Sequence, residues 1–186
     1  MNPIWTLAQA VATSISGGAN FVVFCETDLP ASPKQTVIGF IKHAIRGRTP
    51  VVIMNDSTAG AIAGANGVHF EGDLPHILGP RCNVDDGQLV GVTVSTLEDV
   101  QSAVHAGADY LLAYFDWTMP DKSLLAVKKF VTASSLPLVV GVDVPLELVP
   151  EVMQAGAAGV GITYASCGAY DKTAETVAYW NLLNTK

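Results

Sequence analysis

The side chains with the clearest chemical potential in this sequence are three oxygen donors, Asn55, Asp56 and Asp73. The apolar run VVIM precedes the first two and GVHF precedes the third, so all three belong at the ends of neighbouring strands. Two carboxylates and an amide oxygen suit Mg²⁺, which takes hard oxygen ligands and retains several waters. Asp56 could equally cap the helix that follows it, and Asp73 a turn before Leu74. Spacing alone does not choose between these interpretations.

Other residues with chemical potential also fall at strand ends: His69, Trp117 and Tyr164. His69 lies in GVHF, where a histidine could act as an acid or a base, although a packed histidine with a backbone partner is the commoner arrangement. Trp117 and Tyr164 could stack on a planar ligand or could plug the opening that the strand ends surround.

One recurring phrase predicts the elements that position these residues. It occurs as SGGANFVVF, AGANGVHF, AGADYLLAY and AGAAGVGIT, beginning at residues 16, 63, 106 and 155. Each copy is typical of a helix end with a glycine cap, followed by a short buried strand. Three more apolar runs alternate with these copies: RTPVVIMND, GQLVGVTVS and SLPLVVGVD, from residues 48, 87 and 135. The sequence therefore predicts seven strands.

Helices are predicted around these strands, near 5–16, 34–46, 57–63, 96–105, 122–133, 145–154 and 171–183. The strands are almost continuously apolar, which indicates a parallel sheet covered on both faces. Such alternation gives either a doubly wound sheet or a (β/α)₈ barrel. The recurring phrase returns at every second strand, and this period of two units favours the barrel, whose interior is layered from alternate strands. We predict an α/β fold of the TIM-barrel type, with one domain over residues 1–186, seven readable strands and the first barrel strand missing.

Composition limits the partners and the location. Asp and Glu number 17 against 10 Lys and Arg, a net charge of −7, which opposes binding to nucleic acid or an anionic membrane. No apolar run reaches the roughly 18 residues of a membrane-spanning helix, and the N-terminal segment lacks a basic signal-peptide region. We expect a cytoplasmic protein whose three cysteines are free thiols.

The predicted strand ends are acidic, and the nearest base in a following loop is Lys122. Every lysine falls in a predicted helix or loop, which argues against Schiff-base chemistry inside the barrel. The sequence also contains no Walker A motif, no GxGxxG after a strand and no GxSxG, so nucleotide-loop and α/β-hydrolase functions have no support.

Motifs along nearly the whole chain resemble those of the thiamine phosphate synthase family and its thiazole tautomerase relatives. GGANFVVFCETD (17–28) resembles GGVDLVQLREKD, PVVIMND (50–56) resembles PLIIND, and GANGVHFEGDLP (64–75) resembles GADGVHLGQEDLP. VGVTVSTLEDVQSAVHAGADYL (90–111) resembles IGVSxHSLEEAxxAxxxGADYI and is the most specific match. Later, LPLVVGVDV and AGAAGVGI resemble IPVVAIGGI and AGADGVAV.

This resemblance implies a (β/α)₈ barrel, often dimeric, that joins hydroxymethylpyrimidine diphosphate to a thiazole phosphate, with Mg²⁺ bound by the diphosphate. A small phosphorylated ligand, Mg²⁺ as cofactor and a homo-oligomer are therefore expected. The resemblance places the metal on Asp56 and Asp73. It places the substrate site on Asn55, Thr93, Lys122, Asp143 and Tyr164.

The chain departs from the family pattern where charge would be stabilised. Val23, Cys25 and Thr27 stand for the Gln, Arg and Lys of QLREK, and Val142-Asp143 stands for the GG of the phosphate-binding strand. Because the reaction separates a diphosphate from a pyrimidine cation, it needs preorganised cations and donors. We predict a divergent member without ordinary synthase activity. The alternatives are a non-catalytic binding or regulatory barrel, and a different small-molecule barrel enzyme with an acidic mouth.

Overall fold

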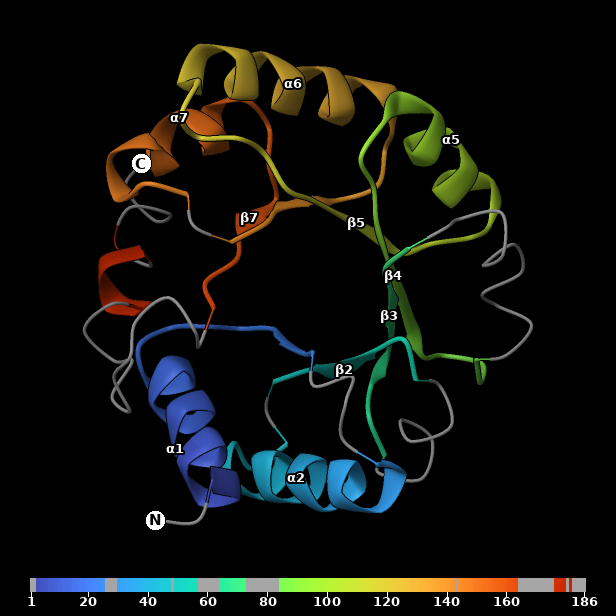
Figure 1. Cartoon of the computed structure of the whole chain (residues 1–186), viewed down its shortest axis with the longest axis vertical. Helices are drawn as coiled ribbons and strands as arrows, with labels where there is room; N and C mark the ends of the chain where they lie inside the picture. The colour runs from blue at the N-terminus through green and yellow to red at the C-terminus, as the bar shows by residue number, and fades with distance from the viewer. Residues whose placement is uncertain are drawn as a thin grey trace.

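Seven short parallel strands form the frame of the molecule. The computed structural model describes residues 3–25, 30–47, 49–56, 64–72, 84–142, 144–163, 176–179 and 181. The strands are β1 (Val22–Phe24), β2 (Val51–Met54), β3 (Gly67–Phe70), β4 (Leu89–Thr93), β5 (Tyr110–Ala113), β6 (Leu138–Val140) and β7 (Gly159–Val160). They pair in chain order, and the sheet curls into a ring surrounded by helices (Figure 1). The predicted TIM-barrel-type fold with seven strands is confirmed.

The helices alternate with the strands and cover the outer face of the ring. They are α1 (Pro3–Ser16), α2 (Ala31–Ala44), α5 (Leu97–His105), α6 (Pro120–Ala133), the 3₁₀ turn η2 (Leu146–Leu148) and α7 (Val149–Gln154). Residues 176–179 and 181 are also helical, whereas the predicted helix over 57–63 lies outside the described residues. None of the helices described is both long and apolar enough to cross a membrane.

Helix α2 begins at Ala31, nearly one turn before the predicted start at residue 34. Pro33 does not prevent this, because the N–H groups of a first helical turn have no intrahelical partner for a proline to remove. The earlier start places Lys34 in the first turn of the helix, next to the carboxyl end of the sheet.

A glycine in each copy of the recurring phrase ends one element and allows the next to begin. Gly18, Gly64, Gly107 and Gly156 all have positive φ, from 66° to 115°, a region in which a side chain is strained. After α5, the Gly107 N–H donates to the Val104 carbonyl at 3.1 Å, which satisfies an end group of the helix. The glycine-cap interpretation of the phrase is confirmed where the structure describes the preceding helix.

The hydrophobic core lies between the sheet and its helices in two clusters. One joins β4, β5 and β6 to α5, α6 and α7, with Leu111 and Phe130 among its members. The other joins β1 and β2 to α1 and α2, with Ile41 and Ile53 among its members. Because side chains alternate along a strand, the intervening residues of each strand face the inside of the ring.

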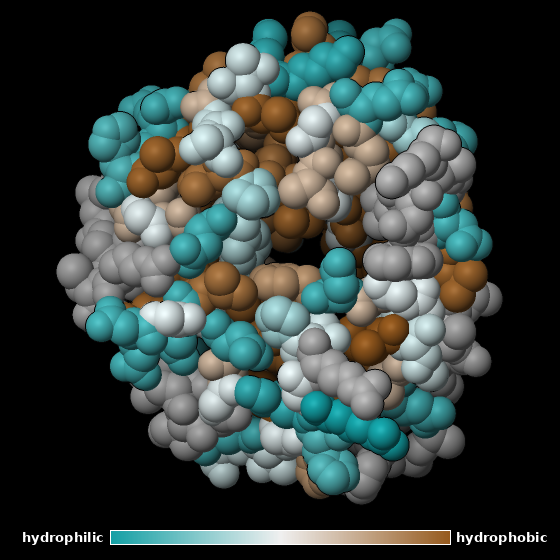
Figure 2. Space-filling view, turned by 180° about the vertical axis from the view of Figure 1, so that it is seen from behind, coloured by the Kyte–Doolittle hydropathy of each residue, from teal (hydrophilic) through white to brown (hydrophobic). Residues whose placement is uncertain are grey.

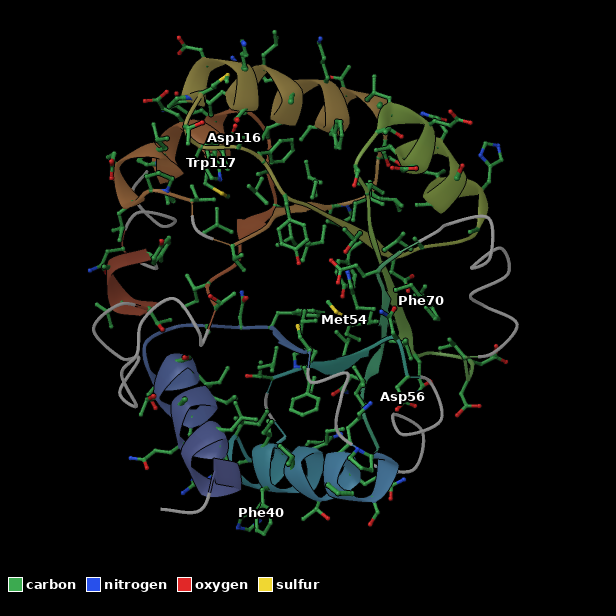
Figure 3. All side chains as sticks on the ribbon, in the orientation of Figure 1. Phe40, Met54, Asp56, Phe70, Asp116 and Trp117 are labelled. Atoms are coloured by element: carbon green, nitrogen blue, oxygen red, sulfur yellow. The ribbon has the colours of Figure 1, made fainter. Side chains whose placement is uncertain are left out.

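The inward-facing residues form levels. Met54 pairs with His69 in register, His69 with Gly91, and Gly91 with Tyr110, so these four positions lie at one level of the ring. Thr93 lies two residues beyond Gly91 on the same face of β4, nearer the carboxyl ends of the strands. Met54 points toward the centre of the ring (Figure 3), and a hollow opens there when the molecule is seen from behind (Figure 2).

The ring is not closed by strand pairing in the part of the chain described. β1 pairs only with β2 and β7 only with β6, so these two strands are the ends of the sheet. β1 and β7 are therefore the two edges of the sheet in the described residues.

Candidate functional site

Asn55 links the ends of β2 and β3. Its φ of 53° lies in the left-handed region, which asparagine tolerates better than most residues. Its backbone N–H donates to the His69 carbonyl, and its side-chain Oδ1 accepts from the Glu71 N–H, both at 2.8 Å. The amide oxygen is thus occupied within the protein, and Nδ2 is the group that Asn55 offers to a ligand.

Asp56, at the end of β2, forms an ion pair with Lys34 of α2. Lys34 Nζ lies 2.9 Å from Asp56 Oδ2, and the two side chains are only 6% and 24% exposed. Figure 3 shows Asp56 beyond the ends of β2 and β3. A buried ammonium group is therefore one partner of Asp56 in this structure.

Lys34 is a residue that the motif comparison did not single out. The sequence nevertheless carries a signal for it, because the buried face of α2 runs through Val37, Ile38 and Ile41 and continues to Ile45, just after the helix. Lys34 occupies the preceding position of that stripe, at the three- and four-residue spacing of a helix face. A lysine on an otherwise apolar helix face predicts a buried partner of opposite charge.

The three residues expected to bind Mg²⁺ do not form a dedicated site in the part of the chain that the structure describes. Asn55 uses its oxygen on a backbone N–H, and Asp56 shares its carboxylate with an ammonium, while Asp73 lies outside the described residues. An ammonium and a divalent cation on one carboxylate repel each other at short range. No cluster of three or more His, Cys, Asp or Glu occurs among the described residues either. Asn55 and Asp56 alone therefore do not complete a metal site within the described residues.

Three side chains from three neighbouring strands form a hydrogen-bonded chain inside the ring. His69 Nδ1 lies 2.9 Å from Tyr110 Oη, and His69 Nε2 lies 2.8 Å from Thr93 Oγ1. Burial lowers the pKa of His69 to about 4, and burial, with lesser effects of Cys25 and Asp109, raises that of Tyr110. Both side chains are therefore neutral near pH 7, and His69 is a packed histidine whose ring partners are side chains.

Gly91 makes room for these hydrogen-bonded side chains. It lies between His69 and Tyr110 in register, and a Cβ at this position would overlap the ring of Tyr110. The phenol ring also contacts Phe21 in an edge-to-face arrangement, with ring centroids 5.3 Å apart. Tyr110 is the second functional candidate that motif reasoning missed. Its inward position follows from strand alternation, since Leu111 and Ala113 belong to the outer core.

Tyr114 and Gly141 lie just beyond the ends of β5 and β6. A Cβ on Gly141 would overlap the Tyr114 ring, so the ring rests against this glycine. Tyr114 remains 47% exposed. Partial burial raises its pKa, and nearby Glu71 and Cys25 raise it further. These neighbours agree with the acidic strand ends predicted from the sequence.

Trp117 lies in the loop between β5 and α6, and Lys122 follows in the first turn of α6. Lys122 is exposed in the first turn of α6, with Nζ 3.3 Å from Met119 Sδ. Trp117 packs against the outer core and Phe115, and its indole Nε1 is buried without a hydrogen-bond partner in the described residues. Figure 3 places Trp117 beside α6 and α7. Trp117 thus packs between the sheet and its helices, which corresponds neither to a plug of the opening nor to an open stacking surface.

The structure thus brings together some of the predicted site residues. Asn55, Asp56 and Thr93 follow or end β2 and β4, and Lys122 lies on the same side of the sheet, at the start of α6. Asp73, Asp143 and Tyr164 lie outside the described residues, as does Thr27.

A ring of parallel strands inside a layer of helices, with polar side chains at the carboxyl ends of the strands, defines a TIM-barrel-type protein whose ligands bind at those ends. A family profile described as thiamine monophosphate synthase matches residues 3–165. The chain therefore belongs to the thiamine monophosphate synthase family.

Named relatives agree with this assignment. The chain is 32% identical to the thiamine-phosphate synthase of Anaeromyxobacter dehalogenans, over 90% of this chain and 78% of that protein. It is 28% identical to the corresponding protein of Roseiflexus sp., over 92% of this chain and 76% of that protein.

Solved structures agree in fold. Thiamine phosphate pyrophosphorylase from Pyrococcus furiosus superposes with a TM-score of 0.78 at 20% identity, covering 95% of this chain and 88% of that one. Family members generally use Mg²⁺ and bind small phosphorylated substrates.

Proposed function

We propose that this chain binds a small phosphorylated ligand of the thiamine-precursor class at the carboxyl ends of its strands and does not catalyse the ordinary synthase reaction. The observation that carries this proposal is the ion pair between Lys34 and Asp56. A carboxylate that the family resemblance assigns to the metal is here neutralised by a buried ammonium group.

The charge balance of the described residues supports the absence of ordinary turnover. Separating a diphosphate from a pyrimidine cation requires fixed positive groups and donors around the leaving group. Lys34 is committed to Asp56, and Cys25 stands where the resemblance places an arginine. Lys122 is exposed, and its Nζ lies beside the Met119 thioether. Each missing donor of this kind costs about 10²–10³ in rate.

The remaining polar groups are suited to binding. Asn55 Nδ2 and Lys122 Nζ are donors for phosphoryl oxygens, and Thr93 adds a hydroxyl. The exposed face of Tyr114 offers an aromatic surface for a planar heterocycle. We assign no Mg²⁺ to the described residues alone, because Asn55 Oδ1 and Asp56 Oδ2 already accept hydrogen bonds within the protein.

Two measurements on the purified chain test the proposal. Isothermal titration calorimetry with hydroxymethylpyrimidine diphosphate, thiazole phosphate and thiamine phosphate, in Mg²⁺ and in EDTA, is expected to show binding of at least one compound in both buffers. Complementation of a thiamine auxotroph that lacks its synthase is expected to fail. Lys122→Gln should weaken binding several-fold, whereas Lys129→Gln on the outer part of α6 serves as the matched control.

Growth of the complemented strain at a near-normal rate contradicts the loss of activity. Absence of binding for all three compounds contradicts the ligand class and favours a different barrel enzyme. Oligomeric state is proposed separately, since the open edges of β1 and β7 suit a second copy of the chain.

A further inference from the structure

The hydrogen-bonded chain inside the ring spans two levels. Tyr110 and His69 lie at the level of Gly91, deep in the ring, whereas Thr93 lies one level nearer the carboxyl ends. His69 is fully buried and Tyr110 is 7% exposed, while Thr93 is only partly buried. The hydrogen bonds thus lead from the buried interior to the side of the ring where ligands of this fold bind.

The direction of each hydrogen bond follows from the number of protons available. Tyr110 has one hydroxyl proton, and the acceptor that the structure gives it is His69 Nδ1 at 2.9 Å. A buried donor left without an acceptor is disfavoured by about tenfold or more. Tyr110 therefore donates to Nδ1, which must be the unprotonated nitrogen of the neutral ring.

If the hydrogen bond between Tyr110 and His69 ran in the opposite direction, fewer hydrogen-bonding groups would be satisfied. If Nδ1 carried the proton, Tyr110 would accept it, and its own hydroxyl proton would have no acceptor among the contacts that the described residues make with it. The desolvation of both side chains, which keeps His69 neutral and Tyr110 protonated near pH 7, excludes a charged alternative.

With Nδ1 accepting, the remaining ring nitrogen Nε2 carries the proton and donates to Thr93 Oγ1 at 2.8 Å. The Thr93 oxygen is then used as an acceptor, and its own proton points elsewhere. We propose that Tyr110 and His69 are positioning residues that orient the Thr93 hydroxyl so that its proton is available as a hydrogen-bond donor toward the ligand site. A ligand acceptor atom is then favoured at Thr93 over a donor group, because His69 already uses one of the two lone pairs of Oγ1.

This inference deepens the proposed function, and its ligand part rests on that function. Its first test does not need a ligand. Long-range ¹H–¹⁵N correlation spectra of the labelled protein at pH 7 report which ring nitrogen of each histidine is protonated, and His69→Gln identifies the His69 signals among those of the four histidines.

We expect a single Nε2–H tautomer for His69. Tyr110→Phe should convert it into a mixture, since the proton that selects the tautomer is gone. Tyr179→Phe is the matched control: its hydroxyl donates to the Val144 carbonyl at 2.8 Å, outside this chain of hydrogen bonds, and its loss should leave His69 unchanged. An Nδ1–H tautomer, or a tautomer that Tyr110→Phe does not alter, overturns the proposal.

The second test measures binding of the precursor compounds that the wild-type chain binds, with inorganic diphosphate as a separate probe. Thr93→Val should weaken binding about tenfold and Thr93→Ser should restore it, while Tyr110→Phe should weaken it several-fold. If inorganic diphosphate shows the same losses, Thr93 donates to a phosphoryl oxygen; if only the heterocyclic compounds show them, it donates to the heterocycle.

Equal binding by wild type and Thr93→Val overturns the inference, even if the proposed function holds. If the wild type binds none of the compounds, the proposed function and the ligand part fail together, and the spectra then decide whether Tyr110 and His69 fix the Thr93 hydroxyl.

Discussion

Lys34 and Asp56 form an ion pair that joins the first turn of α2 to the end of β2, with Nζ 2.9 Å from Oδ2. A buried lysine on an apolar helix face is costly unless a carboxylate faces it, and a carboxylate at a strand end loses its water when the helix packs over it. Each charge is therefore retained because of the other.

Removal of one partner should therefore destabilise the chain. We expect Lys34→Met to lower the free energy of unfolding by about 2–4 kcal/mol, since Asp56 is left partly buried without its counter-ion. Urea unfolding of Lys34→Met, Asp56→Asn and the double variant measures the coupling energy of the pair. Lys128→Met, an exposed position of α6, is the control. A loss below about 0.5 kcal/mol for both single variants contradicts a structural role for the pair.

The same pair predicts how the free protein responds to Mg²⁺. Millimolar Mg²⁺ should leave the Tm of the wild type unchanged, because an ammonium group already neutralises Asp56. Lys34→Gln removes that charge and should make the Tm sensitive to Mg²⁺. Ca²⁺ at the same ionic strength controls for general salt effects. Mg²⁺-specific stabilisation of the wild type would show that Asp56 does bind the metal.

Burial of His69 predicts a loss of stability on acidification. Its pKa is about 4 in the folded chain, against 6.5 for an unburied histidine, so the unfolded chain binds the proton more readily. The contribution to stability is complete above about pH 6.5 and is lost as the pH falls toward 4, with a total of about 3 kcal/mol.

Urea unfolding at a series of pH values measures this contribution. His69→Gln should flatten the decline between pH 6.5 and 4, whereas His43→Gln, on the exposed part of α2, should not. Identical slopes for wild type and His69→Gln would mean that His69 titrates equally in both states.

The ends of the sheet predict a homodimer. β1 and β7 each have one strand partner in the described residues, and unpaired edges are templates for pairing with another chain. Light scattering at micromolar concentration should give twice the chain mass of 19.5 kDa. Hydrogen exchange of the amides at 22–24 and 159–160 should slow as concentration rises, whereas that of α6 should not. A monodisperse monomer with concentration-independent exchange contradicts this prediction.

Much of the fold was predictable from local pattern. The recurring phrase carries both a glycine that ends a helix and an apolar run that forms a strand. Its four copies and the three apolar runs that alternate with them together predict the number and order of the strands. Less of the site was predictable, because Lys34 and Asp56 are 22 residues apart and meet only when α2 packs on the sheet. Tyr110, His69 and Thr93 likewise meet through the register of three strands, which no single segment encodes.

One measurement tests most directly whether this member of the family has lost the synthase activity. It is the initial rate of thiamine phosphate formation by the purified chain with both substrates and Mg²⁺. The synthase of Anaeromyxobacter dehalogenans, 32% identical, is the reference assayed in parallel. We predict a rate at least about 10³-fold below the reference, since several preorganised charges are absent. A rate within about tenfold of the reference contradicts the account, because Lys34 and Asp56 would then have to separate during turnover.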